Sequence, residues 1–303
     1  MERWGIIYSP KTGVWHTHRR WEQIRRLLNE SGVEYDFVQS EGSGSEQRLS
    51  AMLAQNGYKT IIVVGGDGAL NRALNGIASV GMEVLKEVRL GVIPNGHGND
   101  WASYWGFDEE NPKQTVDWLV KGRSRKVDLG VVKSETETRY FLNCLNIGLA
   151  SSIFDLKHKT YRFWGMSSLS YLSSMFLLLF HRMENHMRLT VNHEKIDERL
   201  MTVCIGSCRG YGQTPNAVPY SGMLDVSVVS HPAVTQLFHG MGLLLTGRFL
   251  TSRNVRPYRT RQRITVSETG NTKVSTDGQV LPEMKAPFQV TVMPETVNFI
   301  IPT

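Results

Sequence analysis

An aspartate lies inside a glycine-rich turn at residues 65–68, which read Gly-Gly-Asp-Gly. The turn follows an apolar run at 61–64 and precedes a segment with the spacing of a helix. A strand, a glycine turn and a helix N-terminus direct backbone N–H groups and the positive end of a helix dipole to one place, which favours phosphate binding. A tight turn without a ligand has the same pattern, so this turn alone leaves both interpretations open.

A second glycine loop, Pro-Asn-Gly-His-Gly-Asn-Asp, occupies residues 94–100 after another apolar segment. The chain contains neither Gly-x-x-x-x-Gly-Lys-Ser/Thr nor a Gly-x-Gly-x-x-Gly that opens a helix, so the two common phosphate motifs are excluded. Two loops at the carboxyl ends of strands in one open sheet form a crevice suited to a nucleotide. The pair of loops therefore predicts a nucleotide site.

Two carboxylates, Asp67 and Asp100, belong to these loops. A bare carboxylate beside a polyphosphate is repelled, unless it binds a divalent cation or accepts the proton that leaves an attacking hydroxyl. We therefore interpret both aspartates as groups that handle a metal ion or a proton during phosphoryl transfer.

The elements that must position these loops alternate between strand and helix patterns up to about residue 130. Such alternation is typical of a mostly parallel sheet with helices on both faces. Strands are predicted at 5–10, 35–39, 59–64, 89–94 and 125–132. Helices are predicted at 15–32, at 112–121 and directly after the first glycine turn. A further helix is predicted to begin at a capping box formed by Ser43 and Glu46 and to end near residue 57.

After Asp128 the pattern changes to alternating strands without regular helices between them, which favours an antiparallel sandwich or barrel. These strands are predicted at 140–149, 187–192, 199–208, 223–230, 263–268, 272–278 and 288–294. The segment 164–182 is helical in pattern, but its uninterrupted apolar part is shorter than a membrane span requires. We expect it either to pack in a domain interface or to touch a bilayer.

The chain of 303 residues carries a formal charge of +6, with basic residues concentrated at 157–162 and 248–263. A basic surface attracts nucleic acid, anionic membranes and phosphorylated ligands alike. Cys144, Cys204 and Cys208 lack the spacing of a zinc site and are expected to be buried thiols. The first residues show no pattern of a secretory signal, so we expect a cytoplasmic protein.

Five motifs occur in a fixed order along the chain: GGDGxxN at 65–71, PxGxGND at 94–100, VDLG at 127–130, GMLDV at 222–226 and DG at 277–278. In this order they resemble the diacylglycerol kinase catalytic-domain family, which includes bacterial lipid kinases and sphingosine kinases. The resemblance implies an α/β nucleotide-binding domain with a mostly parallel open sheet, and an all-β antiparallel, sandwich-like second domain. It assigns 1–129 with a returning segment, 294–303, to the first domain and 130–293 to a lipid-substrate domain.

The resemblance also implies an activity, the transfer of the γ-phosphoryl of ATP, with Mg²⁺, to the hydroxyl of a diacylglycerol or sphingoid base. Matching the motifs residue by residue implies a nucleotide site lined by Ser9, Pro10, Lys11, Thr12, Gly13, Ser40, Gly65, Gly66, Asp67, Gly68, Ala69, Asn71, Arg72, Asn95, Gly96, His97, Gly98 and Asn99. It implies an acidic network of Asp67, Asp100 and Asp128, a metal loop with Val218, Ser221 and Met223, and a catalytic acceptor position at Asp277 and Gln279.

The chain departs from the family's pattern at several of these positions. The family's asparagine is Ser9, its threonines are Ala69 and His97, its glutamate in the first loop is Arg72, its aspartate metal ligand is Ser221, and its glutamate proton acceptor is Gln279. A missing general base typically costs about 10²- to 10⁴-fold in rate, whereas positioning and charge neutralisation dominate phosphoryl transfer. We therefore expect a slow kinase, with Asp67 or Asp128 in the acceptor network, and the alternative is a nucleotide-binding regulatory member with little turnover.

A lipid substrate implies a membrane contact, because its hydroxyl must be reached at a bilayer. We expect a peripheral contact with the inner face of the membrane through 157–182 and the arginines of 248–263, since each basic residue near anionic lipid contributes roughly 1 kcal/mol. Nucleic acid is not an expected partner, because the arginines lack interleaved aromatics beyond Phe249 and Tyr258. The sequence leaves a homodimer open.

Overall fold

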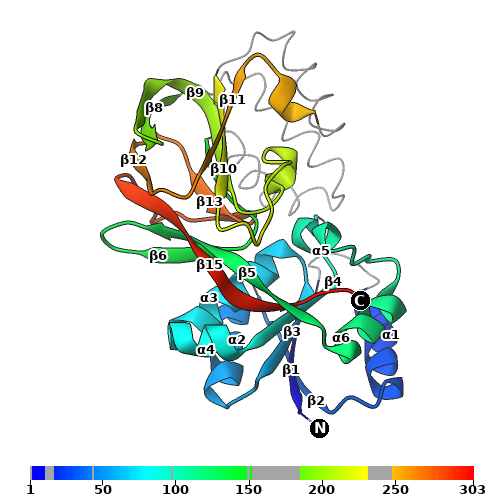
Figure 1. Cartoon of the computed structure of the whole chain (residues 1–303). Coiled ribbons are helices and arrows are strands. Elements are labelled where there is room, and N and C mark those ends of the chain that lie inside the picture. Colours follow the sequence, from blue (N-terminus) through cyan, green and yellow to red (C-terminus); the bar gives the residue numbers. More distant parts are fainter. Residues whose placement is uncertain are drawn as a thin grey trace. The chain divides into compact units, whose positions relative to one another are not determined.

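The computed structural model describes residues 2–10, 17–42, 44–96, 98–148, 151, 185–230 and 248–303. The chain forms two compact units, shown in Figure 1. Unit 1 comprises residues 1–127 and 295–303, and unit 2 comprises residues 128–294. The boundaries expected from the sequence, after residues 129 and 293, differ from these by two residues and one residue.

Unit 1 contains a sheet with the strand order β15-β4-β3-β1-β2. Its strands are β1 (Trp4–Tyr8), β2 (Tyr35–Gln39), β3 (Thr60–Gly65), β4 (Arg89–Pro94) and the end of β15 (Phe288–Ile300). All neighbouring pairs in this order are parallel. Strand β3 is buried along its whole length, as its continuous apolar run predicts for a strand covered on both faces. Parallel strands end at the same edge of a sheet, so their following loops meet there.

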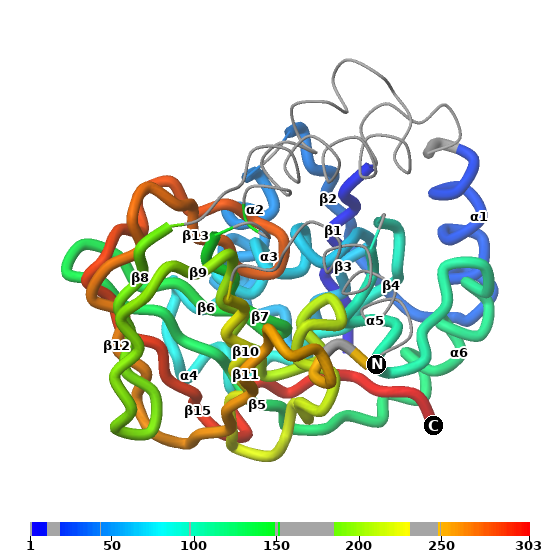
Figure 2. The backbone as a smooth tube through the Cα atoms, turned by 90° about the horizontal axis from the view of Figure 1, so that it is seen from above, coloured from blue at the N-terminus to red at the C-terminus, as the bar shows by residue number. Residues whose placement is uncertain are grey.

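Helices cover both faces of this sheet (Figure 2). They are α1 (Thr17–Glu30), α2 (Ser45–Gln55), α3 (Asp67–Val80), α4 (Met82–Glu87), α5 (Asp100–Tyr104) and α6 (Pro112–Lys121). Apolar residues of α1 and α6, among them Trp21, Ile24 and Leu119, share one buried cluster with the sheet. Helices α2 and α3 approach closely at Gly76, where an added Cβ would lie 2.0 Å from Ser50 Oγ.

One helix start differs from the prediction. The N-cap residue of α2 is Gly44, with a φ of 98° and no side-chain cap, so the expected Ser43/Glu46 capping box is wrong. Ser43 lies outside the described residues. The carboxylate of Glu46 instead turns into the protein and accepts hydrogen bonds from Ser9 and Arg72, because a charged guanidinium is a stronger partner than a backbone amide.

Unit 2 is an antiparallel β structure. Its strands are β5 (Ser124–Lys133, from Asp128), β6 (Thr138–Phe141), β7 (Cys144–Gly148), β8 (Asn185–Val191), β9 (Glu194–Gly206), β10 (Leu224–Ser230), β11 (Val255–Thr260), β12 (Ile264–Glu268), β13 (Val274–Thr276), β14 (Gln279–Val280) and the start of β15. Short 3₁₀ turns occupy Gly210–Gly212 and Phe249–Thr251. Strand β9 pairs with β7, β8 and β10, which makes it the centre of the unit.

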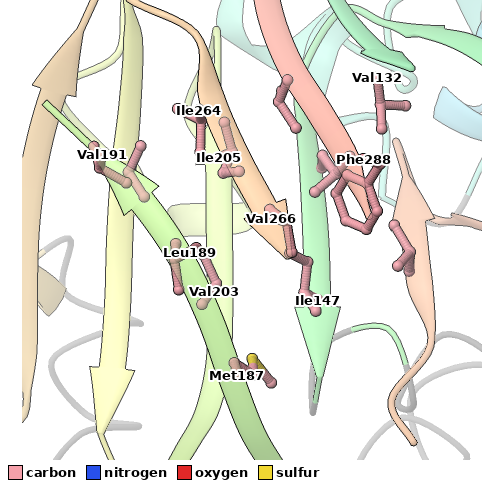
Figure 3. Close-up of a cluster of buried hydrophobic side chains, with 14 of the residues drawn as sticks. Val132, Ile147, Met187, Leu189, Val191, Val203, Ile205, Ile264, Val266 and Phe288 are labelled. Atoms are coloured by element: carbon pink, nitrogen blue, oxygen red, sulfur yellow. The ribbon is translucent and has the colours of Figure 1, made fainter. Parts of the chain in front are cut away.

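The core of unit 2 consists of alternate residues from neighbouring strands (Figure 3). Met187, Leu189 and Val191 of β8 point inward together with Val203 and Ile205 of β9. Successive residues of a strand face opposite sides, so this spacing places every second residue in the core. Cys144, Cys204 and Cys208 are buried free thiols, as the sequence predicts.

The structure confirms the predicted fold class, an α/β unit with a mostly parallel sheet and an antiparallel β-rich unit. Strand β11 was not predicted, because its arginines suggest a solvated basic segment. Within the described residues, no helix combines the length and apolar character needed to cross a membrane. The helix expected at 164–182 lies outside those residues.

Candidate active site

The expected nucleotide loops of unit 1 meet at the carboxyl ends of its strands. Backbone hydrogen bonds join neighbouring ends: Ser9 N donates to Val64 O at 2.9 Å, Ser40 N to Tyr8 O at 2.8 Å, and Asn95 N to Gly65 O at 3.0 Å. Parallel register extends to these ends, since Tyr8 lies opposite Val64 and Gly65 opposite Pro94. The sheet therefore presents the predicted residues along one edge.

The two glycine loops are in backbone contact. A Cβ added to Gly96 would lie 2.3 Å from the Cα of Gly66, and one added to Gly66 would lie 2.9 Å from the Cα of Gly96. Side chains at either position would separate the loops, because backbone atoms cannot yield as a flexible side chain can. These glycines serve close approach of the two loops, which brings their backbone N–H groups to one place.

The second loop has a fixed shape and one unused donor. Gly96 N donates to Asn99 Oδ1 at 2.9 Å, and Asn99 Nδ2 donates to Gly96 O at 3.0 Å and to Glu109 Oε2 at 2.8 Å. The side-chain amide nitrogen of Asn95 is buried and has no hydrogen-bond partner. A buried donor without a partner is costly, so a ligand oxygen at this point would satisfy it.

Asp67 ties the two loops together. Its carboxylate oxygens accept hydrogen bonds from the backbone N–H groups of Asp100 and Trp101, both at 3.0 Å. These donors begin α5, so Asp67 fixes the start of that helix to the start of α3. The geometry gives Asp67 an anchoring role, and its expected part in metal or proton handling stays a prediction.

The N-terminus of α3 lies at this loop pair. Its N-cap residue, Gly66, provides no side-chain cap, and Gly68 and Ala69 follow in the first turn. Ala69 is buried, and a Cβ added to Gly65 would lie 2.8 Å from its Cβ, so the turn is tightly packed. An uncapped N-terminus of a 14-residue helix suits an anion. Asn71 is buried one turn further on and accepts a hydrogen bond from Asn75.

Glu46 joins three of the expected nucleotide residues. Its Oε1 accepts hydrogen bonds from Ser9 Oγ at 2.6 Å and from Ser40 Oγ at 3.1 Å. Arg72 donates from Nε to Oε2 at 2.7 Å and from Nη2 to Oε1 at 3.2 Å. The Glu46 side chain is 2% exposed and that of Arg72 is 16% exposed, so this ion pair is nearly buried.

The environment keeps Glu46 ionised. Burial of the carboxylate opposes its charge, but the hydrogen bonds and charge of Arg72, together with Ser9, outweigh burial and hold the pKa of Glu46 below its usual value. Sequence reasoning missed this residue as part of the site. The one signal for a place in the site was the position of Glu46 shortly after the end of β2. The sequence pattern indicated a place for Glu46 in a helix capping box instead.

In unit 2, Asp128 anchors the expected metal loop. The fully buried Asp128 accepts a hydrogen bond at 2.6 Å from Gly222 N, and its own N–H donates to Pro219 O at 2.8 Å. Ser221 Oγ accepts from Met223 N at 3.3 Å, and Val218 O accepts from Ser221 N at 3.1 Å. The loop thus keeps a defined turn through its own backbone.

The side chains of the described residues do not by themselves make up a complete site for a divalent cation. Mg²⁺ and Ca²⁺ require six or more oxygen ligands, usually with one or more carboxylates. Among the residues that the structure describes, no three His, Cys, Asp or Glu side chains group together for a metal ion. In the loop around Ser221, where the resemblance implies a carboxylate, the side chain is a neutral hydroxyl that already accepts a backbone N–H. Any divalent cation would therefore depend mainly on oxygens of the nucleotide.

Asp277 is held by three backbone donors. Its carboxylate accepts hydrogen bonds from Leu142, Asn143 and Cys144 N, each at 2.9 Å, and the residue is 3% exposed. Its φ of 46° turns the chain sharply before Gln279, the first residue of β14. The structure therefore gives Asp277 a role in holding this turn, and the role of acceptor expected at Asp277 and Gln279 stays a prediction.

The structure groups the predicted residues into two sets, each within its own unit. Unit 1 brings together the residues from Ser9, Ser40, the two glycine loops and Arg72, and unit 2 holds Asp128 with the 218–223 loop and, separately, Asp277 with Gln279. Lys11, Thr12, Gly13 and His97 lie outside the described residues.

The arginine-rich segment is partly neutralised. Arg259 on β11 donates to Asp225 Oδ1 at 2.6 Å and to Asn216 O at 2.7 Å, and Arg256 pairs with Glu198. The hydrogen bond with Asp225 is the main reason that the pKa of Arg259 is raised. Arg261 and Arg263 follow the strand and are exposed. Only part of the segment is therefore available to an anionic surface.

Comparison with known proteins agrees with these two units. Residues 3–132 match a model described as the diacylglycerol kinase catalytic domain, and residues 152–301 match a YegS C-terminal NAD kinase beta sandwich-like domain. The chain is 26% identical over 289 residues to a diacylglycerol kinase of Staphylococcus carnosus, covering 93% of this chain and 90% of the relative. It is 23% identical over 284 residues to one of Bacillus subtilis, covering 92% and 90%.

A solved structure shares the fold. The crystal structure of a diacylglycerol kinase from Bacillus anthracis superposes with a TM-score of 0.75 at 20% identity, covering 99% of this chain and 97% of that one. The two domain models match successive parts of the chain, and the relatives of similar length carry the same family name. The chain belongs to the diacylglycerol kinase catalytic-domain family.

Proposed function

We propose that this protein is an ATP-dependent lipid kinase that transfers the γ-phosphoryl group of ATP to a lipid hydroxyl of the diacylglycerol or sphingoid-base type. ATP binding is supported by the contact between Gly66 and Gly96, beside the buried Asn95 amide that lacks a hydrogen-bond partner. A lipid substrate is supported by the relatives in Staphylococcus carnosus and Bacillus subtilis, which are both named diacylglycerol kinase.

In this proposal the chain's own residues act by binding and orientation. Backbone N–H groups at the start of α3 and the Asn95 amide hold phosphate oxygens, and Asp67 keeps both loops in register through α5. Phosphoryl transfer is accelerated mainly by such positioning and by stabilisation of charge. A divalent cation that arrives with ATP would be held mainly by phosphate oxygens, where it would neutralise their charge.

A second candidate is a nucleotide-binding member with little turnover. The observation that favours it is the pair of neutral groups in unit 2, Ser221 in the expected metal loop and Gln279 at the expected acceptor position. An amide cannot accept the hydroxyl proton as a carboxylate does, and a missing general base typically lowers the rate by about 10²- to 10⁴-fold. Nucleotide binding without phosphorylated lipid would distinguish this candidate.

Transfer from γ-labelled ATP to lipid vesicles tests the proposal. Wild-type protein is incubated with vesicles that contain diacylglycerol, a sphingoid base or neither, and the lipids are separated by chromatography. We expect labelled lipid in at least one reaction and its loss in Asp67→Ala, because the two loops then lose their shared anchor. Asp117→Ala, an exposed carboxylate on α6, should keep the product. Absence of labelled lipid in every reaction would contradict the proposal.

A further inference from the structure

Glu46 occupies the centre of a hydrogen-bond cluster at the ends of β1 and β2. Its donors come from three separate segments: Ser9 after β1, Ser40 after β2 and Arg72 on α3. Ser9 and Ser40 follow the strand ends that carry the proposed nucleotide site. A nearly fully buried carboxylate therefore accepts hydrogen bonds from residues that are expected to line the nucleotide site.

The cluster uses the hydroxyl hydrogens that a phosphate would need. Ser9 Oγ donates to Glu46 at 2.6 Å. Ser40 Oγ lies 3.1 Å from Glu46 Oε1 and 3.0 Å from Gly42 O, and Ser45 Oγ donates to Gly42 O at 2.8 Å. A hydroxyl has one hydrogen to donate, so Ser9 and Ser40 have only lone pairs left for a ligand. Lone pairs repel phosphate oxygens.

Arg72 also donates hydrogen bonds to Glu46, which occupies groups that a phosphate would need. Its Nε and Nη2 both point to Glu46, at 2.7 and 3.2 Å, so two of its three nitrogens face the carboxylate and its charge is neutralised. Ser9, which donates to Glu46, is close to the glycine turn, because a Cβ added to Gly65 would lie 3.4 Å from Ser9 Cβ. Along α3, Arg72 follows Asp67 by five residues, or about 7.5 Å of helix rise.

We infer that Glu46 weakens the hold of this site on nucleotide phosphates, by engaging the hydroxyls of Ser9 and Ser40 and by neutralising Arg72. This inference rests on the proposed function, since it concerns the same nucleotide site. Glu46 is a positioning residue that limits affinity, and its removal should strengthen binding. A residue that only stabilised the fold would show no such gain when replaced.

The test is Glu46→Gln, which removes the charge with little change of shape. The single oxygen of the amide can accept from Arg72 while its NH₂ donates to Ser9, which frees the Ser9 hydrogen for a ligand. Calorimetry should show at least about fivefold tighter binding of ATP, because two unit charges about 4 Å apart interact by about 1 kcal/mol even at the dielectric constant of water. The gain should be smaller for AMP and absent for uncharged adenosine.

The control is Glu83→Gln, which removes an exposed carboxylate on α4, beyond the far end of α3. It should leave ATP affinity unchanged, and circular dichroism and thermal unfolding should show that both variants are folded. A folded Glu46→Gln with unchanged or weaker ATP binding, or with an equal gain for adenosine, would overturn the inference and leave the proposed function standing. Failure of the wild-type protein to bind ATP would overturn both.

Discussion

The glycine loops of unit 1 and the loops of unit 2 differ in what they require from side chains. In unit 1 the contact between Gly66 and Gly96 is made by backbone, and the changed residue Arg72 has a buried partner in Glu46. In unit 2 the corresponding residues are Ser221 and Gln279, and both are neutral at positions where the resemblance to the family implies carboxylates. A site that binds through backbone tolerates side-chain substitution, whereas a proton acceptor depends on one side chain.

This contrast predicts that a single carboxylate introduced into unit 2 raises the rate of phosphoryl transfer. Gln279→Glu places a carboxylate at the expected acceptor position, so the rate of phosphoryl transfer should rise by about 10²- to 10⁴-fold. The rise should appear in kcat, with a nearly unchanged KM for ATP. Gln289→Glu, on β15, is the control and should have no effect. An unchanged kcat in Gln279→Glu would contradict the view that unit 2 depends on one carboxylate side chain as proton acceptor.

A second prediction compares a buried aspartate of unit 2, Asp277, with an exposed one, Asp197. In Asp277→Asn, the new NH₂ group faces a backbone N–H of Leu142 or Asn143, so donor opposes donor and the unfolding free energy should fall by roughly 3 kcal/mol. Chemical denaturation measures this loss. Asp197→Asn, which breaks a surface pair with Arg188, should lose less than about 1 kcal/mol. Equal effects would show that the three backbone bonds to Asp277 are not stabilising.

A third prediction concerns the arginines after β11. Glutamine at the exposed Arg261 and Arg263 should weaken sedimentation with anionic vesicles, by roughly 1 kcal/mol or about fivefold for each residue near the lipid surface. Exposed Arg199 on β9 provides the control, replaced in the same way. Binding that does not depend on the fraction of anionic lipid would contradict an electrostatic membrane contact through this segment.

The smallest predicted effect is a dependence of stability on pH from Glu46. Its pKa is lower in the folded protein than in the unfolded chain, so the ionised form stabilises the fold above the unfolded pKa of about 4.5. This contribution should be lost as pH falls through the folded pKa. Wild-type and Glu46→Gln unfolding curves should differ by a constant amount from pH 7 to pH 5 and converge in more acidic solution, and a constant difference down to pH 3 would contradict the assignment.

The sequence predicted the strands of unit 1 and most strands of unit 2, because continuous or alternating apolar residues determine which faces are buried. It missed β11, where Arg256 and Arg259 find acidic partners that only the folded sheet brings near. It also predicted that the two glycine loops would meet, since both follow parallel strands.

The role of Glu46 could not be predicted from local pattern. Its partners Ser9 and Arg72 are 37 and 26 residues away along the chain, and a carboxylate near a helix start has an ordinary explanation as part of a cap. The three hydrogen bonds from backbone N–H groups to Asp277 could not be predicted either, because Leu142 lies 135 residues earlier in the chain. Long-range polar contacts leave no periodic signal in the sequence.

The central claim is that the contact between the two glycine loops holds the nucleotide, and ATP binding to Gly96→Val tests it most directly. The added side chain must push Gly66 away, so calorimetry should show affinity reduced on the order of 100-fold or more. Gly42→Ala, whose added Cβ meets nothing within 4 Å, should bind ATP as the wild-type protein does. A folded Gly96→Val protein with wild-type affinity for ATP would contradict the claim.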